Sequence, residues 1–101
     1  MESILKDTLA EERERKHEMR QMYLDEISEL PKGSLVVQTI GGNDYCYLKY
    51  RLGDKVISSY IGKACDHQME LEKKIARRRR LEQALRRIKE DLRIIDRAIG
   101  K

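Results

Sequence analysis

The sequence predicts an α+β fold: a helix over residues 2–30, a three-stranded antiparallel sheet over 34–63, and a long helix over 66–100. Three observations lead to this prediction. Apolar residues recur at helical spacing in the first and last thirds. The middle third is instead rich in β-branched residues and tyrosine. Glycine and proline stand where one pattern changes to the other. At 101 residues, we expect residues 1–101 to form a single domain.

The first helix is predicted from one apolar face, which is formed by Leu5, Leu9, Met19, Tyr23, Ile27 and Leu30. A charged run over residues 11–18 interrupts this face and places Glu12 and Lys16 where the pattern would have apolar residues. Pro31 should end the helix, because a proline disfavours helical geometry at the residue before it.

Three strands are predicted over residues 34–40, 45–51 and 55–61. Gly41-Gly42 and Gly53-Asp54 form short turns between them, so consecutive strands should pair antiparallel. We expect Gly62 to end the third strand.

The last helix should begin at Asp66, which suits a helix N-cap. Its apolar residues recur at spacings of 4, 3, 4, 3 and 4, the pattern of a coiled-coil seam formed by Leu81, Leu85, Ile88, Leu92, Ile95 and Ile99.

If the two helices pack antiparallel along their whole lengths, Tyr23 and Ile27 should lie near Leu71 and Ile75. The charged centre of the first helix would then face Leu85 and Ile88 and leave them without apolar partners. This geometry predicts a homodimer in which a second copy covers the seam.

Charge is distributed unevenly along the chain. The net charge is +4, but residues 1–30 sum to −4 and residues 72–101 to +7. A basic segment favours nucleic acid or another polyanion as partner, whereas the alternative is a solvated helix face.

The basic segment contains four consecutive arginines, Arg77, Arg78, Arg79 and Arg80. Guanidinium groups bind phosphates in a forked geometry and stack on bases, so the run is a candidate site for nucleic acid or a partner protein. The alternative is pairing with acidic residues of the first helix, together with solvation.

A second candidate site lies on the middle strand. Alternation places Tyr45, Tyr47, Lys49 and Arg51 on one face of the sheet, and Cys46, Leu48 and Tyr50 on the other. The second set is expected to be core. The first set combines aromatic rings with cations, as nucleic-acid-binding surfaces do, although Tyr45 and Tyr47 would also suit burial against a helix.

No catalytic, metal or cofactor site is predicted. Cys65 and His67 are close in sequence, but His17 is the only other histidine, and a zinc site usually needs four ligands. The chain has neither the pattern of a signal peptide nor an apolar run long enough to span a membrane. Its two cysteines suit a reducing compartment. We therefore expect a non-enzymatic, soluble, cytoplasmic protein without contact to a membrane.

Several short motifs resemble a family of small uncharacterised proteins of bacteria and mobile elements. They are Leu30-Pro-Lys-Gly-Ser34, the tyrosine-rich strand Tyr45–Arg51, Gly53 with Lys55, and Tyr60-Ile-Gly-Lys63, and the resemblance covers roughly residues 29–100. The sheet is also loosely similar to the arm-type DNA-binding sheet of integrases. That likeness implies that Tyr45, Tyr47, Lys49 and Arg51 contact DNA.

Two functions follow as expectations. One is a nucleic-acid-binding accessory protein of a bacterium or mobile element, acting through the arginine-rich helix and the Tyr/Lys/Arg face. The other is a protein–protein inhibitor or adaptor from a phage or mobile element that blocks a host nucleic-acid-processing enzyme, in the manner of an anti-CRISPR protein.

Overall fold

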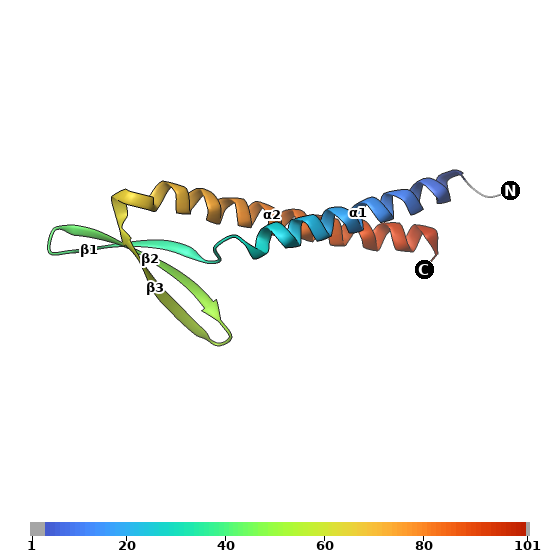
Figure 1. Ribbon diagram of the computed structural model, residues 1–101. Helices are drawn as coiled ribbons and strands as arrows, with labels where there is room; N and C mark the ends of the chain where they lie inside the picture. Colours follow the sequence, from blue (N-terminus) through green and yellow to red (C-terminus); the bar gives the residue numbers. More distant parts are fainter. Residues whose placement is uncertain (1–3, 101) are drawn as a thin grey trace. The chain divides into compact units, whose positions relative to one another are not determined.

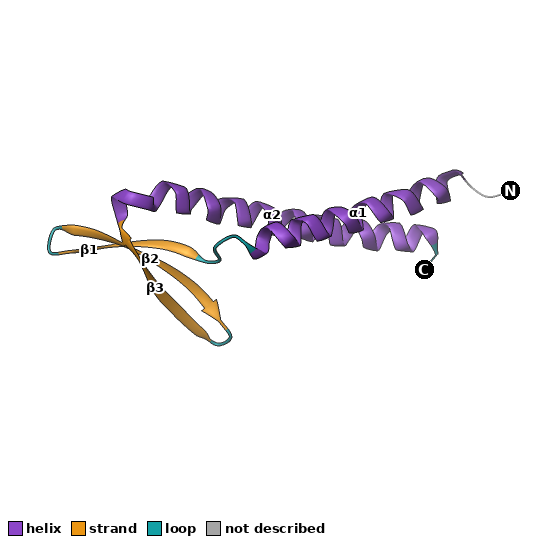
Figure 2. Ribbon diagram, viewed as in Figure 1, coloured by secondary structure: helices purple, strands orange, loops and turns teal. Residues whose placement is uncertain are grey.

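The computed structural model describes residues 4–100, with the side chains of residues 64–67 left out of the description. Its elements follow in the order α1 (Ile4–Ser28), β1 (Ser34–Ile40), β2 (Asn43–Leu52), β3 (Lys55–Lys63) and α2 (Ala64–Ile99) (Figures 1 and 2). The predicted α+β fold class, with a helix on either side of a three-stranded antiparallel sheet, is confirmed.

The chain divides into two compact units. The helical unit contains residues 1–29 and 80–101, and the sheet unit contains residues 30–79. Helix α2 therefore supplies its first part to the sheet unit and its second part to the helical unit. The expectation of one domain stays a prediction, which a single cooperative unfolding transition would support.

In the helical unit, α1 and the second part of α2 run antiparallel. Two ion pairs fix their register: Arg13 Nε lies 2.9 Å from Asp96 Oδ1, and Lys16 Nζ lies 3.5 Å from Asp91 Oδ2. Residues nearer the C-terminal end of α1 thus contact residues nearer the N-terminal end of this part of α2. The most buried side chains of α2 in this unit are spaced seven residues apart, as in a coiled coil, and are Leu81, Ile88 and Ile95.

This register corrects part of the predicted helix packing. Ile88 is only 3% exposed, so the expectation that it lacks an apolar partner within the chain is wrong. Tyr23 lines a groove with Ala84 and Ile88, rather than lying near Leu71 or Ile75. The prediction failed because it paired the two helices along their whole lengths, whereas the first part of α2 belongs to the sheet unit.

The charged interruption of α1 also finds partners within the chain. Lys16 lies on the apolar face, but its side chain is only 17% exposed and its ammonium group is 3.5 Å from carboxylates of both Glu12 and Asp91. Its aliphatic stem can lie along the seam while the charged end reaches those carboxylates at the rim. The interruption therefore does not prevent α1 from covering the seam.

In the sheet unit, the strands lie in the order β1-β2-β3, and both connections are tight antiparallel hairpins. Gly41 and Gly42 have φ values of 58° and 82°, which fit a type I′ turn between Ile40 and Asn43. In the second hairpin only Gly53 has a positive φ, 65°, as a type II′ turn requires.

A β-bulge interrupts the pairing of β2 with β3. Tyr47 pairs with Tyr60, but its neighbour Cys46 pairs with Gly62, so Ile61 is the extra residue on β3. Beyond the bulge, Lys63 pairs with Tyr45. Gly62 has a φ of 149°, which a residue with a side chain rarely adopts. The prediction that Gly62 ends the third strand is therefore wrong, because this glycine allows the strand to continue through the bulge.

The start of α2 also differs from the prediction. The helix begins at Ala64, directly after β3, so Asp66 lies inside its first turn rather than at its cap. The side chains of Cys65, Asp66 and His67 fall outside the described residues. Within the part of the chain that is described, neither helix combines the length and apolar character needed to cross a bilayer.

Candidate functional site

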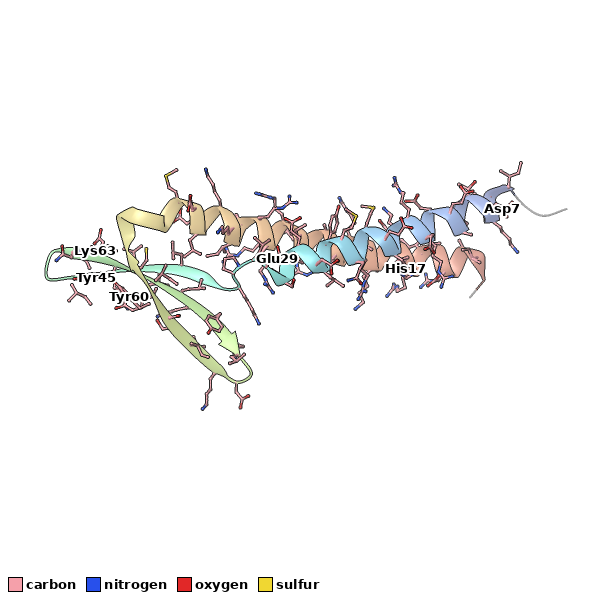
Figure 3. The ribbon with its side chains drawn as sticks, in the orientation of Figure 1. Asp7, His17, Glu29, Tyr45, Tyr60 and Lys63 are labelled. Atoms are coloured by element: carbon pink, nitrogen blue, oxygen red, sulfur yellow. The ribbon has the colours of Figure 1, made fainter. Side chains whose placement is uncertain are left out.

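One face of the sheet brings together three tyrosines and three cations. The register places Tyr45 beside Lys63, Tyr47 beside Tyr60, and Lys49 and Arg51 opposite Ser58 and Val56. We call the set Tyr45, Tyr47, Lys49, Arg51, Tyr60 and Lys63 the tyrosine face. Four of these residues were predicted from the alternation of β2, and Tyr60 and Lys63 join them from β3 (Figure 3).

The ring of Tyr60 contacts the rings of both Tyr45 and Tyr47. The centroid of the Tyr60 ring lies 6.2 Å from the centroid of the Tyr45 ring, and the two ring planes make an angle of 53°. The corresponding values for Tyr60 and Tyr47 are 5.5 Å and 57°. These are tilted arrangements, which aromatic pairs prefer over face-to-face stacking. Tyr60 is 56% exposed, whereas Tyr45 and Tyr47 are half-buried. The cluster thus holds its rings in place while leaving aromatic surface in solvent.

The charge of this face has one sign. The strand positions that share the face by register carry no Asp or Glu: beyond the tyrosine face itself they are Ser34, Val36, Gln38, Ile40, Asn43, Val56 and Ser58. Lys49, Arg51 and Lys63 are exposed, and among the described residues none of them has a carboxylate within ion-pair distance. The face therefore presents three cations around an aromatic centre.

The other face of the sheet carries apolar side chains that pack. Cys46 is 2% exposed, and Leu48 and Tyr50 are half-buried, in keeping with their predicted place in the core. Leu35, on the same face, lines a groove with Ile75 and Ala76 of α2. The apolar face of β1 thus lies toward the first part of α2 at Leu35.

Two of the four consecutive arginines hold the connection between α1 and β1. Arg78 Nη1 donates to the carbonyl oxygen of Leu30 at 2.8 Å, and Arg79 Nη2 donates to the Gly33 carbonyl at 3.2 Å and to Ser34 Oγ at 3.0 Å. We call Arg78 and Arg79 the arginine latch.

Gly33 lies close to the middle strand beneath the latch. A Cβ added at this position would lie 2.2 Å from the Lys49 carbonyl oxygen, and the residue has a φ of 116°. The motif Leu30–Ser34 is thus explained by local structure: two carbonyls and a hydroxyl accept from the latch, and a glycine permits close approach to β2.

The remaining arginines of the run, Arg77 and Arg80, are exposed on α2. Arg77 belongs to the sheet unit and Arg80 to the helical unit, where Arg80 lines a groove with Arg87 and Lys16. The run is therefore divided between the two units, and Arg79 is exposed as well.

A second groove lies in the helical unit, between α1 and α2. Leu24 of α1 and Leu85 and Leu92 of α2 form its apolar part, and all three are half-buried. Its remaining lining residues are the exposed cations Arg20, Arg86 and Lys89. We call this set of six residues the leucine groove.

The described residues hold no cluster of three or more His, Cys, Asp or Glu side chains that could bind a metal ion. The Cys65–His67 pair is outside this statement, because its side chains are not described.

Comparison with known proteins identifies a family for this chain. Residues 5–73 match the family Domain of unknown function (DUF6788), and neither a curated protein nor a solved structure matches the chain. The matched range contains the Leu30–Ser34 motif and the whole tyrosine face, and it ends before Arg77. Because the match covers more than half of its length, the chain belongs to the DUF6788 family.

Proposed function

We propose that this protein is a non-enzymatic, nucleic-acid-binding accessory protein that contacts single-stranded nucleic acid through the tyrosine face. One observation carries the proposal: three clustered tyrosines and three cations share a sheet face that has no carboxylate. Exposed aromatic rings stack on bases of any sequence, while neighbouring cations hold the phosphate backbone.

Single strands suit this face better than a duplex. Stacking on Tyr60 requires a base whose flat surface is free, and in a duplex the bases already stack on one another. Arg80 supplies a further exposed cation on α2, whereas Arg78 and Arg79 already donate hydrogen bonds within the chain. We therefore narrow the expected role of the arginine-rich helix to Arg80.

Salt dependence gives the first test. With labelled single-stranded DNA and RNA oligonucleotides, fluorescence anisotropy should give an affinity that falls steeply with salt. If Lys49, Arg51 and Lys63 each neutralise one phosphate, log K should fall with log[salt] at a slope of about −2, or roughly 20-fold between 50 and 200 mM. A flat salt response would refute the proposal. Equal affinity for a duplex would refute its stacking part.

Substitutions give the second test. Tyr60→Ala should weaken single-strand binding by roughly 5- to 150-fold, corresponding to about 1–3 kcal/mol for one lost stack. The double variant Lys49→Ala/Arg51→Ala should reduce both affinity and salt slope. Lys73→Ala/Lys74→Ala is the matched control, because it removes two exposed lysines from α2 in the same unit. Equal losses in both double variants would show non-specific attraction instead of a defined face.

A second candidate function, a protein-binding inhibitor or adaptor aimed at a nucleic-acid-processing enzyme, is favoured by the leucine groove. The predicted homodimer would use Leu85 and Leu92, which also line this groove. Ile88, a third residue of the predicted seam, is already buried within the chain. A pull-down with and without nuclease treatment separates the two functions: partners released by nuclease are bridged by nucleic acid, and those retained are protein partners.

A further inference from the structure

The leucine groove combines an apolar floor with a rim of one charge. Its half-buried leucines come from both helices, and its cations Arg20, Arg86 and Lys89 are exposed. Among the described residues, none of these three cations is within ion-pair distance of a carboxylate or donates a hydrogen bond. Most other cations of α1 nearby, by contrast, are paired: Arg13, Arg15 and Lys16 all contact Asp or Glu.

The spacing of the floor fits a third helix. Leu85 and Leu92 are seven residues apart, so they are separated by about 10 Å along α2 at ~1.5 Å per residue. This is the repeat at which an apolar stripe of another helix returns to the same face. Leu24 completes the floor from α1, which makes a groove of about 350 Å³ between two antiparallel helices.

We propose that the leucine groove binds an acidic amphipathic helix of a partner protein. Leucines or other apolar residues of that helix would lie on Leu24, Leu85 and Leu92, and its flanking carboxylates would pair with Arg20, Arg86 and Lys89. Coiled coils select partners in this way, by charges that flank an apolar seam.

Two other occupants fit less well. A second copy meeting the groove through two-fold symmetry would place Arg20, Arg86 and Lys89 against the same three cations, and like charges across an interface oppose association. Nucleic acid would satisfy the cations, but leucine side chains give bases no aromatic surface on which to stack. The acidic helix is the occupant that uses both the floor and the rim.

The site is independent of the proposed nucleic-acid contact. The leucine groove lies in the helical unit, and the tyrosine face lies in the sheet unit. Either proposal can therefore fail alone: Tyr60→Ala should leave helix binding unchanged, and changes to the groove should leave single-strand stacking unchanged.

The test uses the full chain and a synthetic peptide of about three heptads, with leucine at the a and d positions and glutamate at e and g. A second peptide carries lysine in place of each glutamate. Isothermal titration calorimetry should show binding of the glutamate peptide and at least tenfold weaker binding of the lysine peptide, since attraction at the rim becomes repulsion.

Matched variants locate the contact. Arg86→Glu/Lys89→Glu should weaken binding of the glutamate peptide about tenfold. Arg80→Glu/Arg87→Glu reverses two cations on the same helix that line the other groove, and it should leave the affinity unchanged. Circular dichroism checks that both variants keep the helical content of the parent chain.

Four outcomes would overturn the proposal. The two peptides could bind equally, or the two double variants could lose equal affinity. The chain could sediment as a dimer that Arg86→Glu/Lys89→Glu converts to a monomer, which would make a second copy the occupant. A single-stranded oligonucleotide could displace the peptide from the wild-type chain and from the Tyr60→Ala variant alike, which would assign the groove to nucleic acid.

Discussion

Gly33→Ala should strongly destabilise the sheet unit. The added Cβ would lie 2.2 Å from the Lys49 carbonyl oxygen and 2.9 Å from Tyr50 Cβ, distances that require β2 or the connection to move. Moving packed backbone costs about 1–3 kcal/mol. Forcing a residue with a side chain to a φ of 116° costs a further ~1–3 kcal/mol. We expect a total loss of about 4 kcal/mol, a large share of the ~5–15 kcal/mol that stabilises a typical domain.

The loss can be measured by urea denaturation followed by tyrosine fluorescence and far-ultraviolet circular dichroism. Gly53→Ala is the matched control, because this turn glycine also has a positive φ, 65°, but no atom lies within 4 Å of an added Cβ. The control should lose only about 1–2 kcal/mol from the left-handed conformation. Equal losses at Gly33 and Gly53 would refute the close approach of Gly33 to β2.

Three further changes test the packing. Arg78→Ala should cost about 2 kcal/mol, because the Leu30 carbonyl loses a charge-assisted donor, whereas the exposed Arg80→Ala should stay within ~0.5 kcal/mol in the same urea assay. Ile88→Ala should cost about 2–5 kcal/mol by thermal unfolding, and Ile94→Ala, 55% exposed, should be nearly neutral; equal effects would contradict the assigned seam. Arg13→Ala should cost less than ~1 kcal/mol, and added salt should shrink the difference from wild type, since the ion pair with Asp96 is about one-third exposed.

The element order could be predicted from the sequence because local signals agreed with one another. Gly41-Gly42 and Gly53-Asp54 marked the hairpins, Pro31 marked the end of the first helix, and alternation along β2 separated its two faces. These signals depend on neighbours a few residues apart, which sequence patterns report well.

The features that the sequence did not predict depend on contacts between residues that are far apart in the chain. The register of α1 on α2 depends on where the connection between α1 and β1 contacts α2. The periodic pattern of apolar residues does not report that point of contact. The arginine latch joins Leu30 to Arg78 across 48 residues of sequence, so a run of arginines had no visible link to the connection.

Two residues of the tyrosine face were missed for a different reason. Tyr60 and Lys63 share a face only because the bulge inserts Ile61 between them. Strict alternation would have separated them, and the one available signal was Gly62, since an isolated glycine in a strand often marks a bulge.

The arginine latch also bears on the order in which the protein folds. The seam-forming helices are separated in sequence by residues 30–79, and closing a loop of that length costs about 2 kcal/mol more than closing a turn of about four residues. With the sheet unit folded, Leu30 O and Arg78 Nη1 lie 2.8 Å apart, so the chain starts and ends this loop at neighbouring points. Folding of the sheet unit would thus bring the two ends of this loop together before the helices meet. We expect its strands to pair before α1 docks on α2.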